Sequence, residues 1–103
     1  ISNGVFIIAP LDSPVRAVAA GKVIFANWLR GYGNMIIISH GGGYMTLYAH
    51  NNSLFKQVGD AVKPGEEIAI VGNSGGLTDP GLYFEIRYRG KTRDPALWCT
   101  RNP

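Results

Sequence analysis

The residues in this chain that could support hydrolytic chemistry are two histidines, His40 and His50, one cysteine, Cys99, and scattered carboxylates. A catalytic zinc ion needs about three nitrogen, oxygen or sulfur ligands and one open position. If residues 35–50 form a hairpin, His50 lies opposite Asn34 and about six residues from His40. At about 3.3 Å per residue the two imidazoles are then roughly 20 Å apart, so they cannot share a metal ion.

Other hydrolytic mechanisms find no better support in the sequence. A serine hydrolase elbow of the form Gly-x-Ser-x-Gly is absent, and Cys99 in `LWCTRN` has no histidine near it in sequence. A single cysteine also excludes an internal disulfide and a Cys-x-x-Cys zinc or redox site. The residue inventory therefore predicts a chain that is not an enzyme.

Length and composition predict one folded domain spanning residues 1–103. Of these residues 46% are hydrophobic and 17% charged, which favours a compact fold over disorder. The net charge of +3 is locally concentrated only in `EIRYRGKTRD`, which is either a solvated strand edge or a small anion site and is too modest for nucleic-acid binding. No apolar run approaches the ~20 residues of a membrane helix, and we expect an excised domain whose targeting regions lie upstream of Ile1.

Fourteen glycines and six prolines separate short runs rich in Val, Ile, Tyr and Phe, which is typical of an all-β protein with little or no helix. Gly41, Gly42 and Gly43 predict a sharp hairpin turn. The pairs Gly59-Asp60 and Pro64-Gly65 predict two further turns, an arrangement that lipoyl domains share, although neither Lys56 nor Lys63 lies at a hairpin tip as a modifiable lysine would. The predicted strands are 5–8, 15–19, 21–28, 35–40, 44–49, 67–72 and 82–87.

Strand parity in `GLYFEIRYR` divides its residues between two faces. Leu82, Phe84 and Ile86 alternate with Tyr83, Glu85 and Arg87. The first set is predicted to be core. The second set, on a face that Gly81 leaves open, combines an aromatic ring, a carboxylate and a guanidinium, and is the candidate functional set.

Nearly the whole chain, from Gly4 to Trp98, resembles the LytM-type (lysostaphin-like) zinc endopeptidases that cut peptidoglycan. Five segments in the same order carry the resemblance: `NGVFIIAPLDSPVRAVAAGKVIFANW`, `GYGNMIIISH`, `LYAHNNSL`, `VGDAVKPGEEIAIVGNSG` and `LYFEIRYRGKTRDPALW`. The resemblance implies antiparallel sheets with a substrate groove. His50 matches a histidine that active relatives keep in `YAH` to assist zinc-bound chemistry.

The same resemblance locates the missing zinc site. Alignment on `AP` and `FEIR` puts Ser2 at the first histidine ligand, Phe6 at the aspartate ligand and Tyr83 at the last histidine ligand, while Gly81 replaces the catalytic histidine. All three ligand positions have therefore lost their metal-binding side chain. We expect no zinc and no other cofactor.

The replaced positions suggest two alternatives. Phe6 and Tyr83 either fill the emptied cavity or belong to a protein interface, where aromatic residues and Arg are the usual anchors. The predicted partner-binding groove comprises Phe6, Tyr32, Met35, Tyr48, His50, Tyr83 and Arg87. Arg87 could bind a partner carboxylate or pair internally with Glu85 or Asp94. His40 is expected to be a turn histidine, and Trp28, Trp98, Phe25, Phe84 and Leu47 are expected in the core.

Degenerate members of the family regulate other enzymes, which makes a periplasmic amidase the implied partner. The resemblance implies a non-catalytic domain that activates N-acetylmuramoyl-L-alanine amidases for septal peptidoglycan splitting during cell division, with upstream regions contacting the division machinery. The alternative is a peptidoglycan-binding module that uses the vestigial groove. An active zinc enzyme is a third and weaker alternative.

Overall fold

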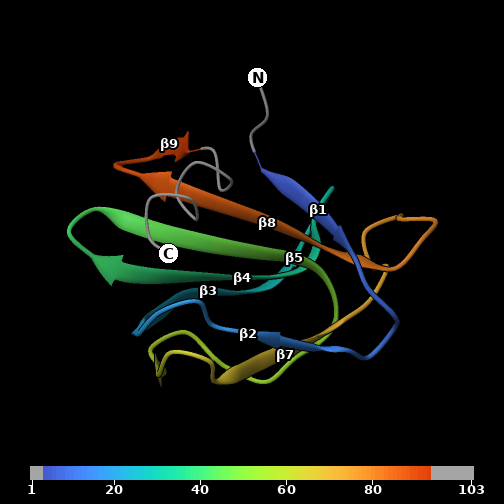
Figure 1. Ribbon diagram of the computed structural model, residues 1–103, viewed down its shortest axis with the longest axis horizontal. Coiled ribbons are helices and arrows are strands. Elements are labelled where there is room, and N and C mark those ends of the chain that lie inside the picture. The colour runs from blue at the N-terminus through green and yellow to red at the C-terminus, as the bar shows by residue number, and fades with distance from the viewer. Residues whose placement is uncertain (1–3, 94–103) are drawn as a thin grey trace.

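The computed structural model describes residues 4–93, and within that range every regular element is a β-strand (Figure 1). The described residues include no helix, and therefore none that is long and apolar enough to cross a membrane. The strands are β1 (Val5–Ile8), β2 (Pro14–Arg16), β3 (Gly21–Leu29), β4 (Gly33–Gly41), β5 (Tyr44–Leu54), β6 (Ala61–Val62), β7 (Glu67–Val71), β8 (Gly81–Tyr88) and β9 (Lys91–Arg93).

The main sheet is antiparallel and has the order β1-β8-β5-β4-β3-β6, with β9 added to β8. Strand β2 pairs with β7, and β7 in turn pairs with the last residues of the long strand β5. Strand β5 therefore passes from the main sheet into the β2–β7 layer, which lies across the lower part of the molecule in Figure 1.

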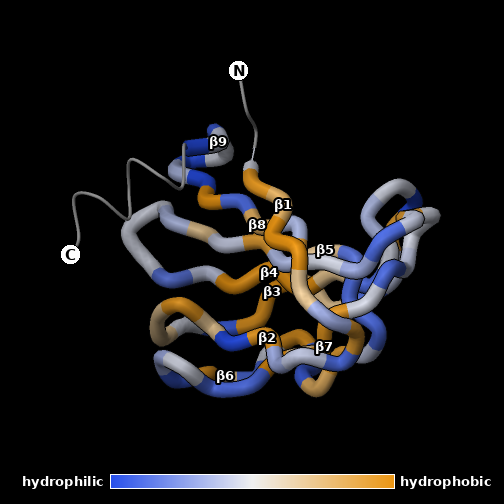
Figure 2. Tube along the Cα trace, turned by 45° about the vertical axis from the view of Figure 1, so that its right-hand side comes forward, coloured by the Kyte–Doolittle hydropathy of each residue, from blue (hydrophilic) through white to orange (hydrophobic). Residues whose placement is uncertain are grey.

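The main hydrophobic core lies between the sheet and the β2–β7 layer. Strand alternation brings one face of β4, β5 and β8 against β2 and β7, and the hydrophobic segments converge at the centre of Figure 2. We call this the core face. Its buried residues are Val15, Ala17, Val23, Ile36, Ile38, Tyr48, Val62, Ile68, Ala69, Val71, Phe84 and Ile86.

The opposite side of the main sheet carries a much smaller cluster of Met35, Leu47 and Ala49, with Phe25, Tyr32, Ile37 and Tyr83 packed around it. We call this the open face, and it also bears Phe6, Glu85 and Arg87, which share the parity of Tyr83. The two faces are built from alternate residues of the same strands. The expectation that Leu82, Phe84 and Ile86 belong to the core agrees with the structure.

A β-bulge in β5 changes the side on which His50 lies. Ile36 pairs with Tyr48, but Asn34 pairs with Asn51 and not with His50 as predicted, so β5 has one extra residue in this stretch. His50 adopts the left-handed conformation, with φ of 66°, which is uncommon for a residue other than glycine. The bulge breaks the simple alternation, so Tyr48 and His50 do not share a face.

Strand prediction from the sequence was correct for β1 in both bounds and short for most other strands. Strands β6 and β9 were not predicted, because two or three residues carry too little alternation to detect. Leu47 and Phe84 are buried as expected, and Phe25 is partly buried. Trp28 was wrongly assigned to the core: it lies near the end of β3, and 54% of its surface is exposed.

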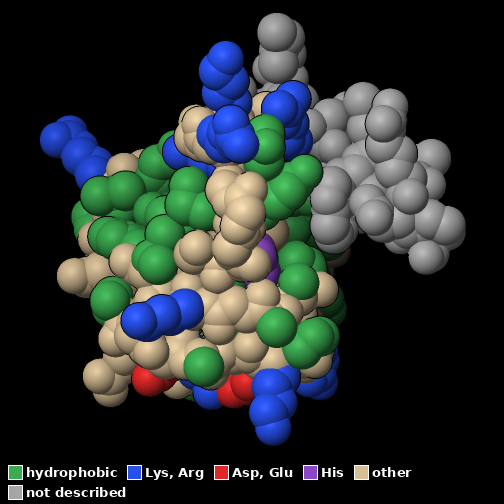
Figure 3. Space-filling view, turned by 90° about the vertical axis from the view of Figure 1, so that its left-hand side faces the viewer, with side chains coloured by type: hydrophobic (Ala, Val, Ile, Leu, Met, Phe, Trp, Pro, Cys, Tyr) green, Lys and Arg blue, Asp and Glu red, His purple; other side chains and the backbone are tan. Residues whose placement is uncertain are grey.

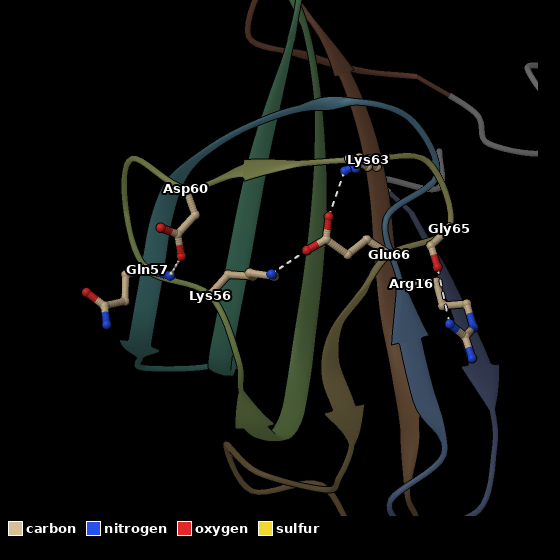
Figure 4. A network of polar contacts seen from close by, with 7 residues as sticks. All are labelled: Arg16, Lys56, Gln57, Asp60, Lys63, Gly65 and Glu66. Carbon is tan, nitrogen blue, oxygen red and sulfur yellow. Dashed lines mark hydrogen bonds and ion pairs between the residues drawn. The ribbon is translucent and has the colours of Figure 1, made fainter.

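Side-chain contacts fix the loops between β5 and β7 (Figure 4). Asp60 accepts a hydrogen bond from the Gln57 backbone N–H at 2.8 Å, and Glu66 accepts one from the Lys63 N–H at 2.9 Å. Lys56 forms an ion pair with Glu66, which links the β5–β6 loop to the turn before β7. The turns predicted around residues 59–60 and 64–65 are present, and they hold β6 against β3.

Candidate protein-binding face

A buried carboxylate organises the open face. Glu85 is 1% exposed and lies in the middle of β8. One of its oxygens accepts a short hydrogen bond from the Tyr83 hydroxyl, and the other accepts one from Arg87 Nε at 2.7 Å. Because both oxygens have a partner, the burial of the charge is compensated. The network therefore fixes Tyr83 and Arg87 relative to each other.

The network also raises the pKa values of Tyr83 and Arg87, and it leaves hydrogen-bond donors available on Arg87. Burial raises the pKa of Tyr83, and the hydrogen bond to the Glu85 carboxylate raises it further. The same carboxylate raises the pKa of Arg87. The internal pair with Glu85, one of the two alternatives predicted for Arg87, is therefore formed. It uses only Nε, and neither Nη atom has an acceptor among residues 4–93.

Tyr32 and His50 join Tyr83 on this face. The ring centroids of Tyr32 and Tyr83 are 6.3 Å apart, and those of His50 and Tyr83 are 6.4 Å apart. The His50 N–H donates to the Tyr32 carbonyl at 2.8 Å. Gly31 and Gly33, both at positive φ, allow the loop to turn there. Three aromatic rings from three distant parts of the chain are thus brought together.

The His50 ring is held in one orientation. Its Nδ1 lies 2.7 Å from the Ser74 carbonyl oxygen, which can only accept, so Nδ1 carries the proton. Nε2 of the neutral ring is then an acceptor, and no donor to it is present in the described part of the chain. Because His50 is only 8% exposed, it lines the base of the face.

Phe6 and Gly81 are packed against each other at the degenerate positions. A Cβ atom added to Gly81 would lie 2.3 Å from Phe6 Cζ, so the ring occupies the space that a side chain at position 81 would need. Phe6 is nevertheless 43% exposed. It therefore both fills the space beside Gly81 and presents an aromatic surface, and the two alternatives from the sequence are not exclusive.

The side chains at the degenerate positions do not fit a zinc ion. Phe6 and Gly81 offer no donor atom, and the Tyr83 hydroxyl is engaged with Glu85. Among residues 4–93 no group of three or more His, Cys, Asp or Glu side chains is arranged to hold a metal. Ser2, the remaining degenerate position, lies outside the described residues, as do Asp94, Trp98 and Cys99.

Besides His50, two other residues predicted for the partner-binding set are buried. Tyr48 is 1% exposed and belongs to the core face, where its ring packs against Phe84 at a centroid distance of 5.4 Å. The prediction placed it beside His50 by simple alternation, which the bulge in β5 invalidates. Met35 does lie on the open side, but it is 3% exposed and forms the floor of the small cluster.

His40 has a structural role, as expected, although it is tied to the core face and not only to the turn. Its Nδ1 lies 2.7 Å from the Ala20 carbonyl oxygen, and its Nε2 lies 2.6 Å from the Thr46 hydroxyl. Thr46 in turn contacts the Tyr48 hydroxyl at 2.8 Å. His40 is thus near the Gly41 end of the β4–β5 hairpin, whereas His50 lies near the opposite end.

Sequence reasoning missed one contributor to the open face and the role of another. Ile8 pairs with Gly81, so it shares the face of Phe6 and Tyr83, and it is 81% exposed. Its place in the apolar run `VFII` gave no signal of exposure, because an uninterrupted apolar run is typical of a strand buried on both faces. Glu85 was placed on the correct face, but its role in holding Tyr83 could not be seen without the side-chain geometry.

The comparisons with known proteins all indicate the same family. The model of peptidase family M23 matches residues 1–95. The murein hydrolase activator EnvC of Escherichia coli is 46% identical over 99 residues, which cover 96% of this chain and 24% of that protein. The murein hydrolase activator NlpD of the same organism is 41% identical over 98 residues, covering 94% and 26% respectively. The chain thus spans about a quarter of the length of these relatives.

Solved structures of peptidases share the fold. The catalytic domain of lysostaphin from Staphylococcus simulans superposes with a TM-score of 0.90 at 29% identity, covering 97% of this chain and 80% of that one. A zinc-containing peptidase from Vibrio cholerae gives 0.85 at 35% identity, covering 88% and 28%. With its LytM-type fold and a family match over almost its whole length, the chain belongs to peptidase family M23.

Proposed function

We propose that this domain is a non-catalytic regulator that binds and activates a periplasmic N-acetylmuramoyl-L-alanine amidase during septal peptidoglycan splitting. The observation that carries the proposal is the ordered Tyr83–Glu85–Arg87 network on a face that no other strand among residues 4–93 covers, at the place where the zinc ligands of active relatives are missing. The amidase would cut the amide between glycan and stem peptide. This domain would cut nothing and would need no zinc.

Residue types and their order support a protein partner. Phe6, Tyr32 and Tyr83 are aromatic residues that project from or line one face, and aromatic residues and Arg are enriched at interface hot spots. Because Glu85 holds Tyr83 and Arg87 in place, little side-chain entropy is lost when a partner binds. The Nη atoms of Arg87, which have no acceptor within residues 4–93, suit a partner carboxylate.

The relatives support the regulatory role. EnvC and NlpD are named as activators of murein hydrolases, and their similar segments cover about a quarter of each protein. Activation requires that the domain bind the open amidase more tightly than the self-inhibited form, because a ligand with equal affinity for both shifts no equilibrium. The remainder of the parent protein would control access and contact the division machinery.

The test is to add the purified domain to a self-inhibited amidase and to measure release of dye from labelled peptidoglycan. We expect the unmutated domain to stimulate dye release and the double variant Tyr83→Ala, Arg87→Glu to lose this stimulation. A hot-spot residue commonly contributes about 2 kcal/mol or more, which is roughly thirtyfold in affinity. Phe55→Ala is the matched control, because Phe55 is 51% exposed in the β5–β6 loop, away from this face.

Two results would refute the proposal. One is a folded parent chain that fails to stimulate any self-inhibited amidase, and the other is full stimulation by the double variant. Stoichiometric zinc together with chelator-sensitive hydrolysis of peptidoglycan by the domain alone would instead establish an active peptidase.

A further inference from the structure

A second distinctive surface lies at the other end of β8, where the β4–β5 and β8–β9 turns come together. Basic side chains gather at the top of Figure 3, the end of the molecule that carries the β8–β9 turn. We call this the β8–β9 patch and define it by Tyr44, Tyr88, Arg89, Lys91 and Arg93. None of these residues belongs to the face proposed to bind the amidase.

The aromatic part of the patch is a pair of tyrosines on adjacent strands. Tyr44 and Tyr88 are cross-strand partners, and their ring centroids are 4.7 Å apart with an interplanar angle of 43°. Tyr44 is 41% exposed, and Tyr88 is partly exposed. Their side chains lie on the same side of the sheet as those of Thr46 and Ile86. They are beyond the packed core, however, so their rings face outward at the end of the sheet.

Two guanidinium groups lie over the same ring. Arg89 Cζ is 5.2 Å and Arg93 Cζ is 5.3 Å from the Tyr88 centroid, within the range of cation–π contacts. Such contacts orient the side chains while leaving their N–H groups free to donate. Arg89, Lys91 and Arg93 are all exposed, and none of them forms an ion pair within residues 4–93.

The backbone holds this arrangement in place. The Arg89 N–H donates to the Gly43 carbonyl at 2.8 Å, which joins the two turns. A Cβ atom on Gly43, whose φ is 86°, would lie 3.0 Å from Arg89 Cγ, so a glycine is needed for this approach. The patch is therefore preformed.

We propose that the β8–β9 patch binds the acidic, peptide-substituted glycan of peptidoglycan. The exposed Tyr44 ring offers an apolar face that attracts the C–H groups of a sugar ring, and the cations held over the neighbouring Tyr88 ring match the carboxylates carried by stem peptides. The turns themselves contain Gly41–Gly43 and Arg89–Gly90 and no apolar side chain that could insert into a lipid layer. Three free cations are also few for the dense charge of a nucleic acid.

The position of the patch allows the amidase and the glycan to be bound together. Tyr88 is five residues from Tyr83 along β8, which is roughly 17 Å at 3.3 Å per residue, and the two tyrosines have opposite parity. The domain would then hold an activated amidase beside its substrate. Glycan binding does not depend on the amidase proposal, since it uses different residues.

The experiment is co-sedimentation of the 103-residue chain with purified, protein-free sacculi over a range of sacculus concentrations. We expect retention of the parent chain and about a tenfold weaker apparent affinity for Arg89→Gln, Arg93→Gln. Lys22→Gln, Lys63→Gln removes the same charge from two exposed lysines elsewhere and should keep parental retention. Tyr44→Ala should also weaken retention, which separates stacking from charge alone.

Each alternative ligand of the β8–β9 patch predicts a different experimental result. Equal losses of sacculus retention in the arginine and lysine double variants would show that binding depends only on overall positive charge, and this would overturn the proposed site. Arginine-sensitive binding to phosphatidylethanolamine–phosphatidylglycerol vesicles without binding to sacculi would assign the patch to a membrane. A loss of amidase affinity in solution, with sacculus retention unchanged, would assign it to a protein. Tyr83→Ala should leave sacculus retention intact, so failure of the amidase proposal would be visible separately.

Discussion

Tyr48 and Tyr83 lie on neighbouring strands of one sheet, yet their surroundings are opposite. Tyr48 is 1% exposed on the core face, where its hydroxyl contacts Thr46 and accepts a hydrogen bond from the Val18 N–H at 3.2 Å. Tyr83 is partly exposed on the open face, where its hydroxyl donates to the buried Glu85. Tyr48 is therefore part of the core, whereas Tyr83 is fixed in one orientation at the surface.

The comparison shows how a fold of peptidase family M23 can be kept while the surface at the positions expected to hold zinc ligands differs. The core face depends on packing against β2 and β7, to which the zinc ligand positions contribute little. The open face carries those positions, and there Phe6, Gly81 and Tyr83 form a packed, hydrogen-bonded surface without ligands. The side chains at these positions therefore lie outside the packing that supports the fold.

The largest expected effect is on the core face. Tyr48→Ala should lower the free energy of unfolding by about 3–5 kcal/mol, because it leaves a large cavity beside Phe84. Urea unfolding followed by circular dichroism measures it. Tyr83→Ala should cost much less stability, and equal losses in the two variants would contradict the distinction between the faces.

Next in size is the removal of the buried carboxylate. Glu85→Ala should lower the free energy of unfolding by about 2 kcal/mol, because Arg87 loses its ion pair and the Tyr83 hydroxyl loses its acceptor. The Arg87 side chain is 34% exposed, so water limits the loss to less than that of a fully buried pair. Glu85→Gln, which preserves shape and an acceptor, is the control. A Glu85→Ala variant as stable as the parent would show that the network is not structural.

An effect of similar size is expected where Phe6 packs on Gly81. Gly81→Ala should destabilise by about 1–3 kcal/mol, since its Cβ would overlap the Phe6 ring and approach the Ile7 carbonyl. Combined with Phe6→Ala, the cost should be about 1 kcal/mol less than the sum of the single variants. Additive losses in this double-mutant cycle would mean that Phe6 does not occupy the space beside position 81.

The smallest effect is on the pH dependence of stability. Burial and Glu85 raise the pKa of Tyr83, so the folded state favours its neutral form. The resulting stability is complete below the unfolded pKa of about 10 and is lost as pH rises through the folded pKa. Tyr83→Phe should therefore reduce the fall in unfolding free energy above about pH 10. Tyr48, whose pKa burial also raises, will retain its share. An unchanged slope would exclude a contribution from Tyr83.

The sequence predicted the fold well because strand alternation and glycine turns are local signals. Alternation in β8 separated Phe84 and Ile86 from Tyr83 and Arg87. It failed in β5, where the left-handed conformation of His50 depends on contacts with Tyr32 and Ser74 from distant loops. Tyr48 was misplaced for that reason. Exposure of Trp28 could not be read from residue type, because it depends on no strand of residues 4–93 packing over the end of β3.

The most direct test of the central claim is to map the contact surface by NMR on an isotope-labelled 103-residue chain titrated with unlabelled amidase. The account predicts that chemical-shift changes concentrate at Phe6, Ile8, Tyr32, His50, Tyr83 and Arg87. Residues of the core face and of the β5–β6 loop around Phe55 should stay unchanged. Changes centred on that loop or on the β8–β9 patch, with the open face unaffected, would contradict it.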